Sequence, residues 1–375
     1  TGVNLLAPST KPKESLRFVT FLVNVIKAVH DHADLLRATI ASAGNEYRLG
    51  ANEAPPAIMS IFLGTLMTKV LEDIENKEIV SIAKGENAYL KLGLTRIPSI
   101  LLDNTDRNRT SPFAFTGNKF EFRAVGSTAN SAHPMMVLNT IVAKQLKEFR
   151  QEYDAERLID DSKKEGIVVK ILKRYISESK SILFEGNGYS KEWEVDAAKR
   201  GLSNIRNTPE ALKSFLRPEY IAVFEEMGVL SQREIEARYE IELENYVKKV
   251  QIESRVVGDL AQNHVISTAI KYQTRLVQTA KSLIDLGLTK EAEPVIQIIK
   301  EISSRVATIS TLVEQSVEAR KYANNLPKIE EMAAVYSTDV KQYSEKIRVE
   351  VDKLELVIDD EDWPLVKYRE LLYVR

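Results

Sequence analysis

The chain has 375 residues, of which 44% are hydrophobic, enough to form a sizeable buried core and to exclude wholesale disorder. Its 52 basic and 54 acidic residues give a net charge of -2, so no basic excess indicates a nucleic-acid or membrane-surface partner. It contains no cysteine, which excludes disulfides, a thiolate nucleophile, cysteine-bound zinc and iron–sulfur clusters within the chain, and fits a cytoplasmic location.

The ends of the chain and its apolar runs limit the class further. No apolar run approaches the ~18 residues that a membrane span needs, and the first residues lack a signal-peptide pattern. The sequence begins at Thr1 without a methionine, so we expect it to be part of a longer protein.

Glycine divides the chain, because eleven of its 15 glycines precede residue 190. Helix interiors disfavour glycine, so we expect a mixed first half and a helical second half. In the first half, apolar residues at helical spacing predict helices over 14–43, 61–79 and 132–149. Between them we expect a connector over 45–56 and a charged loop over 103–109. The loop is followed by a predicted hairpin, in which 111–115 and 119–124 flank the connection 116–118.

The second half reads as a bundle of long helices over roughly 205–355. Thr208 is a predicted N-cap with Pro209 in the first turn, and Ser231 with Glu234 forms a capping box. Gly287 followed by Thr289 predicts a helix end and a new start. Apolar residues recur at helical spacing at Ile235, Tyr239, Leu243, Tyr246, Val250, Val257 and Leu260, and again at Met332, Tyr336, Val340, Tyr343, Ile347 and Leu354.

The stretch 119–123 has the strongest local pattern for chemistry. In a strand, Phe120 and Phe122 point to one side, while Lys119, Glu121 and Arg123 share the other. Such a cation–anion–cation row is suited to a metal ion and phosphate oxygens. The alternative is an ordinary solvent-facing strand with ion pairs.

Two other stretches are candidates for binding. The loop 106–111 carries Arg107 and Arg109, whose planar guanidinium groups suit carboxylate or phosphate, or else it is a solvated turn. In 48–56, glycine and two prolines would hold Glu53 in a fixed backbone; the alternative is a helix entry capped by Asn52.

The histidines and tryptophans are weaker candidates. His30 and His32 are two residues apart on a predicted helix and point to different faces, which makes a poor metal pair. We expect His264 to lie in or beside the core, and we expect Trp193 and Trp363 to be packing anchors.

The three stretches together resemble the C-terminal part of the glutamine synthetase catalytic domain. The family pattern runs Arg…Glu-Ala-Pro, Asn-Arg-Ser and Arg-x-Glu-x-Arg, and it corresponds here to Arg48 with 53–55, to 108–110 and to 119–123. The amino-acid sequence of 50–56 and the long helical tail resemble the type III branch of the family, which is the large bacterial form. Three departures stand out: the spacing from Arg48 to Glu53 is one residue short, Lys119 replaces an arginine, and Ala114 replaces another arginine.

The resemblance implies an α+β fold in which the C-terminal portion of a glutamine synthetase catalytic domain, with antiparallel strands and helices, precedes a mainly α-helical bundle. The expected domains are 1–155 for the catalytic portion, 156–204 for a connecting region and 205–375 for the helical domain. We expect that no catalytic side chain comes from the helical domain, which would pack on the catalytic portion or against another subunit.

The resemblance also implies an activity. The complete protein would be a glutamate–ammonia ligase that uses ATP and Mg²⁺ or Mn²⁺ and forms a γ-glutamyl phosphate intermediate in glutamine biosynthesis. It would act as a homo-oligomer of stacked rings with active sites between subunits. This chain would supply part of that site and be inactive alone, because one carboxylate does not make a magnesium site.

The residue roles follow the same resemblance. Glu121 would bind metal and Lys119 nucleotide phosphate, Arg48 and Arg123 would bind glutamate, Arg109 would stabilise the transferring phosphoryl group, and Glu53 would close over the intermediate. Two alternatives stay open: a related γ-glutamyl-amine ligase, and a non-catalytic structural or regulatory assembly protein.

Overall fold

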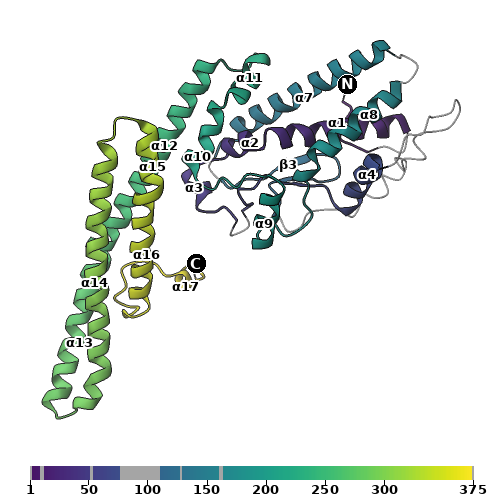
Figure 1. Cartoon of the computed structure of the whole chain (residues 1–375). Coiled ribbons are helices and arrows are strands. Elements are labelled where there is room, and N and C mark those ends of the chain that lie inside the picture. Colours follow the sequence, from purple (N-terminus) through teal and green to yellow (C-terminus); the bar gives the residue numbers. More distant parts are fainter. Residues whose placement is uncertain are drawn as a thin grey trace. The chain divides into compact units, whose positions relative to one another are not determined.

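The computed structural model describes residues 2–8, 12–50, 54–76, 110–126, 129–159 and 164–373. These ranges are mostly helical, with a three-stranded sheet in the first part of the chain (Figure 1). The chain divides into two compact units, Thr1–Tyr239 and Glu240–Arg375. The mixed first part and helical second part agree with the prediction from glycine usage, whereas the boundaries at 155 and 204 stay a prediction.

The elements of the first unit are α1 (Pro12–Asp31), α2 (Ala33–Thr39), α3 (Ala43–Glu46), β1 (Ile61–Phe62), α4 (Thr65–Asn76), β2 (Phe113–Phe115), β3 (Phe120–Phe122), α7 (Ala132–Ile159), α8 (Lys164–Ser179), η4 (Lys180–Ile182), α9 (Lys191–Lys199), α10 (Thr208–Leu212), η5 (Lys213–Leu216) and α11 (Pro218–Glu226). Helix α12 (Gln232–Asp259) contains the unit boundary. The second unit continues with η6 (Leu260–Ile266), α13 (Ser267–Asp285), α14 (Thr289–Asn324), α15 (Ile329–Val335), η7 (Tyr336–Val340), α16 (Lys341–Glu355) and α17 (Tyr368–Leu371).

The sheet has the order β1-β2-β3. The predicted hairpin is confirmed, because β2 and β3 pair antiparallel, but β1 pairs with β2 in parallel, where only antiparallel strands were expected. Parallel neighbours need a long crossover, and α4 lies in the chain between these two strands. The helix predicted over 61–79 therefore starts later, at Thr65, because Ile61 and Phe62 belong to β1.

Aromatic side chains join the sheet to the helix that covers it. Phe113 and Phe115 are buried, and Phe120 from β3 stacks on Phe113 with ring centroids 4.9 Å apart. Phe18 of α1 packs against Phe115 at 5.9 Å. The same helix buries Leu22 and Ile26, and it packs against α7 and α8. The core of this unit therefore lies on two sides of α1. One side of α1 packs against the sheet, and other sides pack against α7 and α8.

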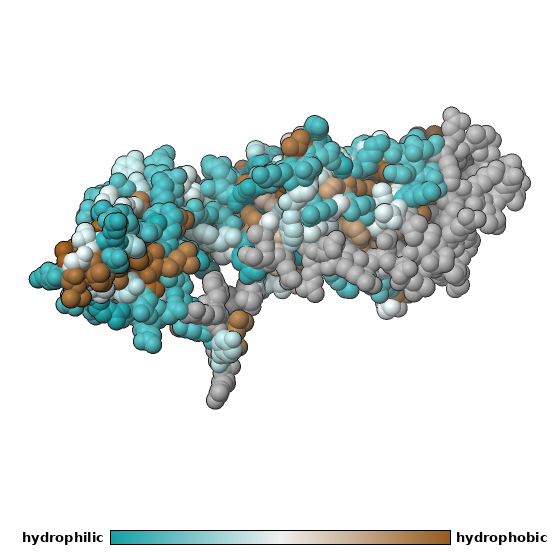
Figure 2. Space-filling view, turned by 90° about the horizontal axis from the view of Figure 1, so that it is seen from below, coloured by the Kyte–Doolittle hydropathy of each residue, from teal (hydrophilic) through white to brown (hydrophobic). Residues whose placement is uncertain are grey.

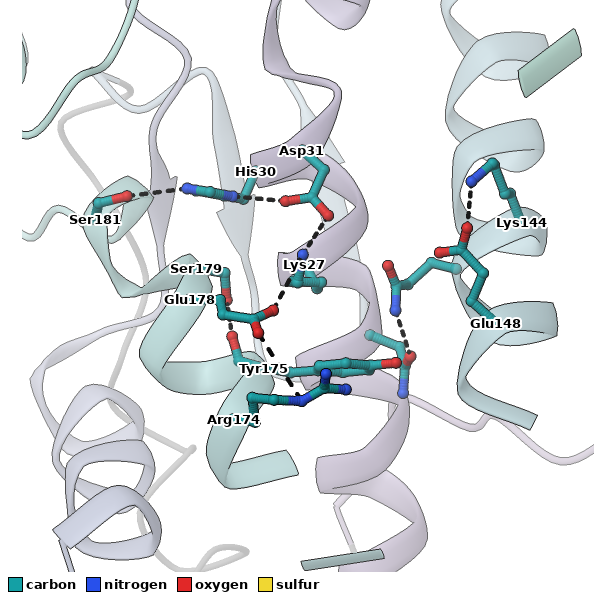
Figure 3. A network of polar contacts seen from close by, with 12 residues as sticks. Lys27, His30, Asp31, Lys144, Glu148, Arg174, Tyr175, Glu178, Ser179 and Ser181 are labelled. Carbon is teal, nitrogen blue, oxygen red and sulfur yellow. Dashed lines mark hydrogen bonds and ion pairs between the residues drawn. The ribbon is translucent and has the colours of Figure 1, made fainter. Parts of the chain in front are cut away.

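A polar network ties the end of α1 to α8 and η4 (Figure 3). Lys27 forms ion pairs with Asp31 and with Glu178, the latter at 3.4 Å. His30 lies between Asp31 and Ser181, with its ring nitrogens 2.8 Å and 3.0 Å from their oxygens. Burial alone would raise the pKa of Asp31, but hydrogen bonds from His30 and Lys27 outweigh it and the pKa is lowered. The network therefore holds a charged carboxylate at this helix junction.

The segment 183–190 returns to the sheet although it was predicted as part of a connecting region. Phe184 N–H donates to the carbonyl of Ile61 at 3.0 Å, and the Phe184 ring stacks on Trp193 at 3.7 Å. One oxygen of Glu185 accepts from the N–H groups of Leu63 and Gly64 and from the hydroxyl of Thr68, at 3.2, 3.0 and 2.8 Å. A carboxylate at the start of α4 satisfies donors that the helix itself leaves open.

The second unit consists of long helices around one apolar core. Helices α13 and α14 pack side by side, and α16 packs on α14. The core includes Val265, Ala269, Ile302, Ile309, Ile347, Leu354 and Trp363. The predicted helix end at Gly287 and the capping box at Ser231 are confirmed, since Ser231 N–H donates to Glu234 at 2.8 Å.

Three details differ from the sequence predictions. The cap of α10 is Asn207, whose side chain accepts from Glu210 N–H at 3.2 Å, and Thr208 is already helical. His264 is exposed, which excludes the predicted position in the core and leaves the one beside it. The second predicted apolar stripe, which runs from Met332 to Leu354, is interrupted by the π-helical turn η7.

None of the described helices is both long and apolar enough to cross a membrane.

The carboxylate at the start of α4 gives a first testable prediction. Glu185→Ala removes an acceptor shared by three donors, so we expect local opening of α4 to become easier by about 2 kcal/mol, or roughly 30-fold faster amide exchange in α4. Glu72→Ala, at an exposed position in the same helix, is the matched control and should leave exchange unchanged. Equal exchange in both variants would show that Glu185 does not hold α4.

Candidate active-site strand

The face of β3 that carries charge holds three side chains in one row. The ammonium nitrogen of Lys119 is 3.1 Å from one carboxylate oxygen of Glu121, and the guanidinium of Arg123 is 3.2 Å from the other. The side chains of Lys119, Glu121 and Arg123 are 61%, 37% and 17% exposed. The predicted common face is therefore confirmed, and the burial of its side chains increases from Lys119 to Arg123.

Backbone pairing fixes the register of this row. Glu121 lies opposite Ala114 of β2, and Arg123 N–H donates to the Pro112 carbonyl at 2.8 Å. At the turn, Thr116 N–H donates to the Lys119 carbonyl at 2.9 Å, and Gly117 takes a positive φ of 97°, which other residues rarely adopt. The aromatic rings on the opposite face prevent a slip of one residue, which would exchange the two faces.

The two cations control the ionisation of Glu121. The hydrogen bond from Lys119 is the largest influence and lowers the pKa of Glu121; partial burial opposes it, and the hydrogen bond from Arg123 adds to the lowering. A carboxyl group with a lowered pKa keeps its charge, and its contribution to the ion pairs, above its ordinary pKa of 4.5. That contribution is lost only as the pH falls through the lowered value. Near neutral pH the row therefore carries two positive charges and one negative charge.

Glu121 has the chemistry of one metal ligand. Its carboxylate is ionised and partly exposed, and hard divalent cations prefer such oxygens. Lys119 is mostly exposed and can move aside or turn toward an anion. Among the described residues no three histidine, aspartate or glutamate side chains gather as a metal-binding group, so further ligands would have to come from elsewhere.

Arg48 lies on a different segment, just after α3, and is exposed. The Arg48 N–H donates to the Asn45 carbonyl at 3.0 Å, and Gly50 N–H donates to the Pro55 carbonyl at 3.2 Å. The second bond joins the chain on either side of Glu53, although Glu53 itself lies outside the described residues. Pro55 is not in a helix, so the alternative of a helix entry at this point is wrong. The convergence of Arg48 with β3 stays a prediction.

The loop 106–111 is described only from Thr110 onward, so Arg107 and Arg109 lie outside the described residues. Thr110 and Ser111 are buried, which is not what a fully solvated turn would give. A Cβ atom added to Gly188 would lie 2.7 Å from the Thr110 carbonyl oxygen and 3.3 Å from its Cβ. The segment 183–190 therefore packs directly on the residue that follows Arg109.

Gly188 and Glu185 are the positioning residues that sequence reasoning missed. Each contacts a residue at least 78 positions away along the chain, since Gly188 meets Thr110 and Glu185 meets Thr68. The only local signal was the pair of glycines at 186 and 188.

This close approach gives a second prediction. Gly188→Ala places a methyl group against the Thr110 backbone, so we expect a loss of about 1–3 kcal/mol in unfolding free energy through forced displacement. Gly44→Ala, where no atom lies within 4 Å of the added Cβ, should be nearly neutral. Denaturant unfolding followed by circular dichroism measures both. A neutral Gly188→Ala variant would show that the two segments do not touch.

Comparison with known proteins places these features in a family context. The family model of the glutamine synthetase C-terminal domain matches residues 167–283 of this chain. The whole chain aligns with "Glutamine synthetase" of Bacteroides fragilis (strain YCH46) at 49% identity, and covers 52% of that protein. It aligns, again over its whole length, with "Type-3 glutamine synthetase" of Dictyostelium discoideum at 38% identity and with "Glutamine synthetase" of Butyrivibrio fibrisolvens at 36%, and covers 51% and 52% of them.

The chain thus spans about half the length of the curated relatives it matches. The resemblance inferred from Arg48, the Asn108–Arg109 pair and the 119–123 strand is confirmed, and it extends over the helical part as well. This chain is a homologue of glutamine synthetases, the type-3 enzyme among them.

Proposed function

We propose that the complete protein ligates ammonia to glutamate, with ATP as the energy source and γ-glutamyl phosphate as the intermediate, and that this chain supplies part of the active site. The observation that carries the proposal is the Lys119–Glu121–Arg123 row, held by β2 with one anion between two cations. The relatives named glutamine synthetase support the same reaction.

The reaction has two displacements. An oxygen of the glutamate γ-carboxylate attacks the terminal phosphorus of ATP, the bond to the bridging oxygen breaks, and ADP leaves. The ammonia nitrogen then attacks the γ-carbonyl carbon, the carbon–oxygen bond to phosphate breaks, and inorganic phosphate leaves, while the nitrogen loses a proton. Both displacements require neutralisation of charge on phosphoryl oxygens.

The row on β3 suits the charged parts of this reaction. Glu121 would hold Mg²⁺ or Mn²⁺, which supplies positive charge to phosphate oxygens when bound. Lys119, exposed at the turn, would contact nucleotide phosphate. Arg123 is oriented by its hydrogen bond to Glu121, and it would bind the glutamate carboxylate by paired donors together with Arg48.

Two further roles come from the resemblance, because Arg109 and Glu53 lie outside the described residues. Arg109 would stabilise the transferring phosphoryl group, and Glu53 would close over the intermediate, exclude water and favour proton loss from ammonium. The hydrogen bond between Gly50 and Pro55 supports the role of Glu53, because it brings the two ends of the segment around Glu53 together.

We also propose that the complete protein is a cytoplasmic homo-oligomer of stacked rings, with active sites between subunits.

The overall test is a product assay on the complete protein. With ATP, Mg²⁺ and glutamate, we expect one glutamine and one phosphate formed per ammonia consumed. If methylamine or ethanolamine gives product and ammonia does not, the protein is a different γ-glutamyl-amine ligase. If no amine gives product or phosphate, the chain belongs to an assembly protein without the reaction.

A third prediction concerns the metal ligand. Glu121→Gln keeps the size of the side chain and removes its charge, so we expect most of the turnover to be lost at any Mg²⁺ concentration. The fold should be little affected, because exposed ion pairs contribute only ~0–1 kcal/mol. Glu72→Gln, an exposed carboxylate on α4, is the control and should turn over normally. Normal turnover of Glu121→Gln at saturating Mg²⁺ would remove Glu121 from the site.

A fourth prediction concerns the substrate. Arg123→Lys keeps a positive charge but loses the planar pair of donors, so we expect the glutamate KM to rise by about 10–100-fold, with little change in the ATP KM. Initial rates with each substrate varied separately measure this. A glutamate KM that stays the same while the ATP KM rises would reassign Arg123 to the nucleotide.

A further inference from the structure

Arg37 of α2 is a charged residue that lies almost entirely inside the first unit. Hydrophilic residues cover much of the coloured surface in Figure 2, as is usual for charged side chains, whereas Arg37 is only 2% exposed. Its Nε donates to the Ile205 carbonyl at 3.0 Å, and its Nη2 donates to the Arg206 carbonyl at 3.4 Å. The buried guanidinium therefore holds the segment that leads into α10 against α2.

The carboxylate of Glu46 lies at the same junction. Glu46 is the last residue of α3, and one of its oxygens accepts from the N–H of Thr208, the first residue of α10, at 3.1 Å. Burial lowers the pKa of Arg37 to about 10, and the negative charge of Glu46 opposes this lowering. Arg37 therefore stays positive at neutral pH. Glu46 is held at the junction by a hydrogen bond and by this buried positive charge.

Glu46 and Arg48 belong to one hydrogen-bonded turn. The turn begins at Ser42, whose hydroxyl accepts from Asn45 N–H at 3.1 Å. The N–H of Glu46 donates to the Ser42 carbonyl at 2.9 Å, and the N–H of Arg48 donates to the Asn45 carbonyl at 3.0 Å. Asn45 is buried, whereas Arg48 is exposed. Because these bonds join the backbone of the turn, a displacement of Glu46 moves Arg48 with it.

We propose that Glu46 is a positioning residue for Arg48, and that its contacts at the start of α10 fix the place of the Arg48 guanidinium in the glutamate site. The inference rests on the proposed function, from which it takes the role of Arg48. Such positioning matters because a displacement of about 1 Å in a substrate-binding group can cost about 100-fold in rate.

The proposal gives the region after residue 204 a part in substrate binding. The contacts with Arg37 and Glu46 come from backbone groups within 205–208, and these residues lie inside the match to the glutamine synthetase C-terminal domain. Backbone carbonyl and N–H groups are common to nearly all residue types, so a search for functional side chains does not find them. The region can therefore position the site without supplying a catalytic side chain.

The first test measures substrate binding in the complete protein. Glu46→Ala should raise the glutamate KM by about tenfold with little change in kcat or in the ATP KM, because Arg48 is displaced and not removed. Glu46→Gln keeps an accepting oxygen but not the charge, so a smaller rise of about threefold is expected. Glu210→Ala, which removes an exposed carboxylate of α10, is the matched control and should leave the glutamate KM unchanged. A wild-type glutamate KM in both Glu46 variants would overturn the proposal.

A double-mutant cycle tests whether Glu46 acts through Arg48. Arg48→Ala should raise the glutamate KM more than Glu46→Ala does, and the double variant should be no worse than Arg48→Ala alone. Effects that multiply would show that Glu46 acts by another route and would overturn the inference while the role of Arg48 stands. An unchanged glutamate KM in Arg48→Ala would instead refute the proposed role of Arg48, and the inference with it. If Glu46→Ala does not fold, the same cycle is run with Glu46→Gln.

Amide hydrogen exchange tests the displacement without substrate. The N–H of Arg48 should exchange about tenfold faster in Glu46→Ala than in the wild type, with Glu46→Gln in between, because the turn loses its contact with α10. Glu210→Ala should exchange as the wild type does. Equal exchange at Arg48 in the wild type and both Glu46 variants would show that other contacts hold the turn, and would overturn the proposal.

Discussion

The antiparallel pairing of β3 with β2 is the constraint on which the candidate site depends. It places Glu121 opposite Ala114 and stacks Phe120 on Phe113, so the aromatic residues lie on one face of the strand and the charged residues on the other. A shift of one residue would send the charges into the aromatic core, at a cost that a small domain does not tolerate. The burial of phenylalanine thereby determines where Lys119, Glu121 and Arg123 lie.

The surrounding elements hold this hairpin from segments far apart in the sequence. Phe18 of α1 packs on β2, while Phe184 pairs with β1 and Gly188 lies against Thr110. The junction of α1 with α8 and η4 is fixed in turn by the polar network around Asp31. A charged row on a short strand can keep one geometry because it rests on this support.

Local patterns predicted the parts of the structure that depend on neighbours in sequence. Alternation predicted the common face of Lys119, Glu121 and Arg123, and the turn at Gly117 predicted the hairpin. Helical spacing predicted the long helices of the second unit. The choice between Asn207 and Thr208 as the cap of α10 failed because both residue types cap well and stand side by side.

What could not be predicted depends on partners distant in sequence. Ile61 and Phe62 fit a helical pattern, and only their pairing with β2 makes them a strand. The contacts of Glu185 with the start of α4 and of Gly188 with Thr110 have no local signal beyond two glycines. The roles of Arg48, Arg109 and Glu53 came from resemblance to a family, because spacing alone does not show which loops converge.

We propose that Glu121, held between two cations, is a metal ligand of a phosphoryl-transfer site. Crystals of the complete protein grown with Mn²⁺ and a non-hydrolysable ATP analogue would test it by anomalous diffraction. We expect an anomalous peak about 2.1 Å from a Glu121 carboxylate oxygen, with Lys119 turned toward phosphate. Bound nucleotide and manganese at another place, with Glu121 still paired only to Lys119 and Arg123, would contradict it.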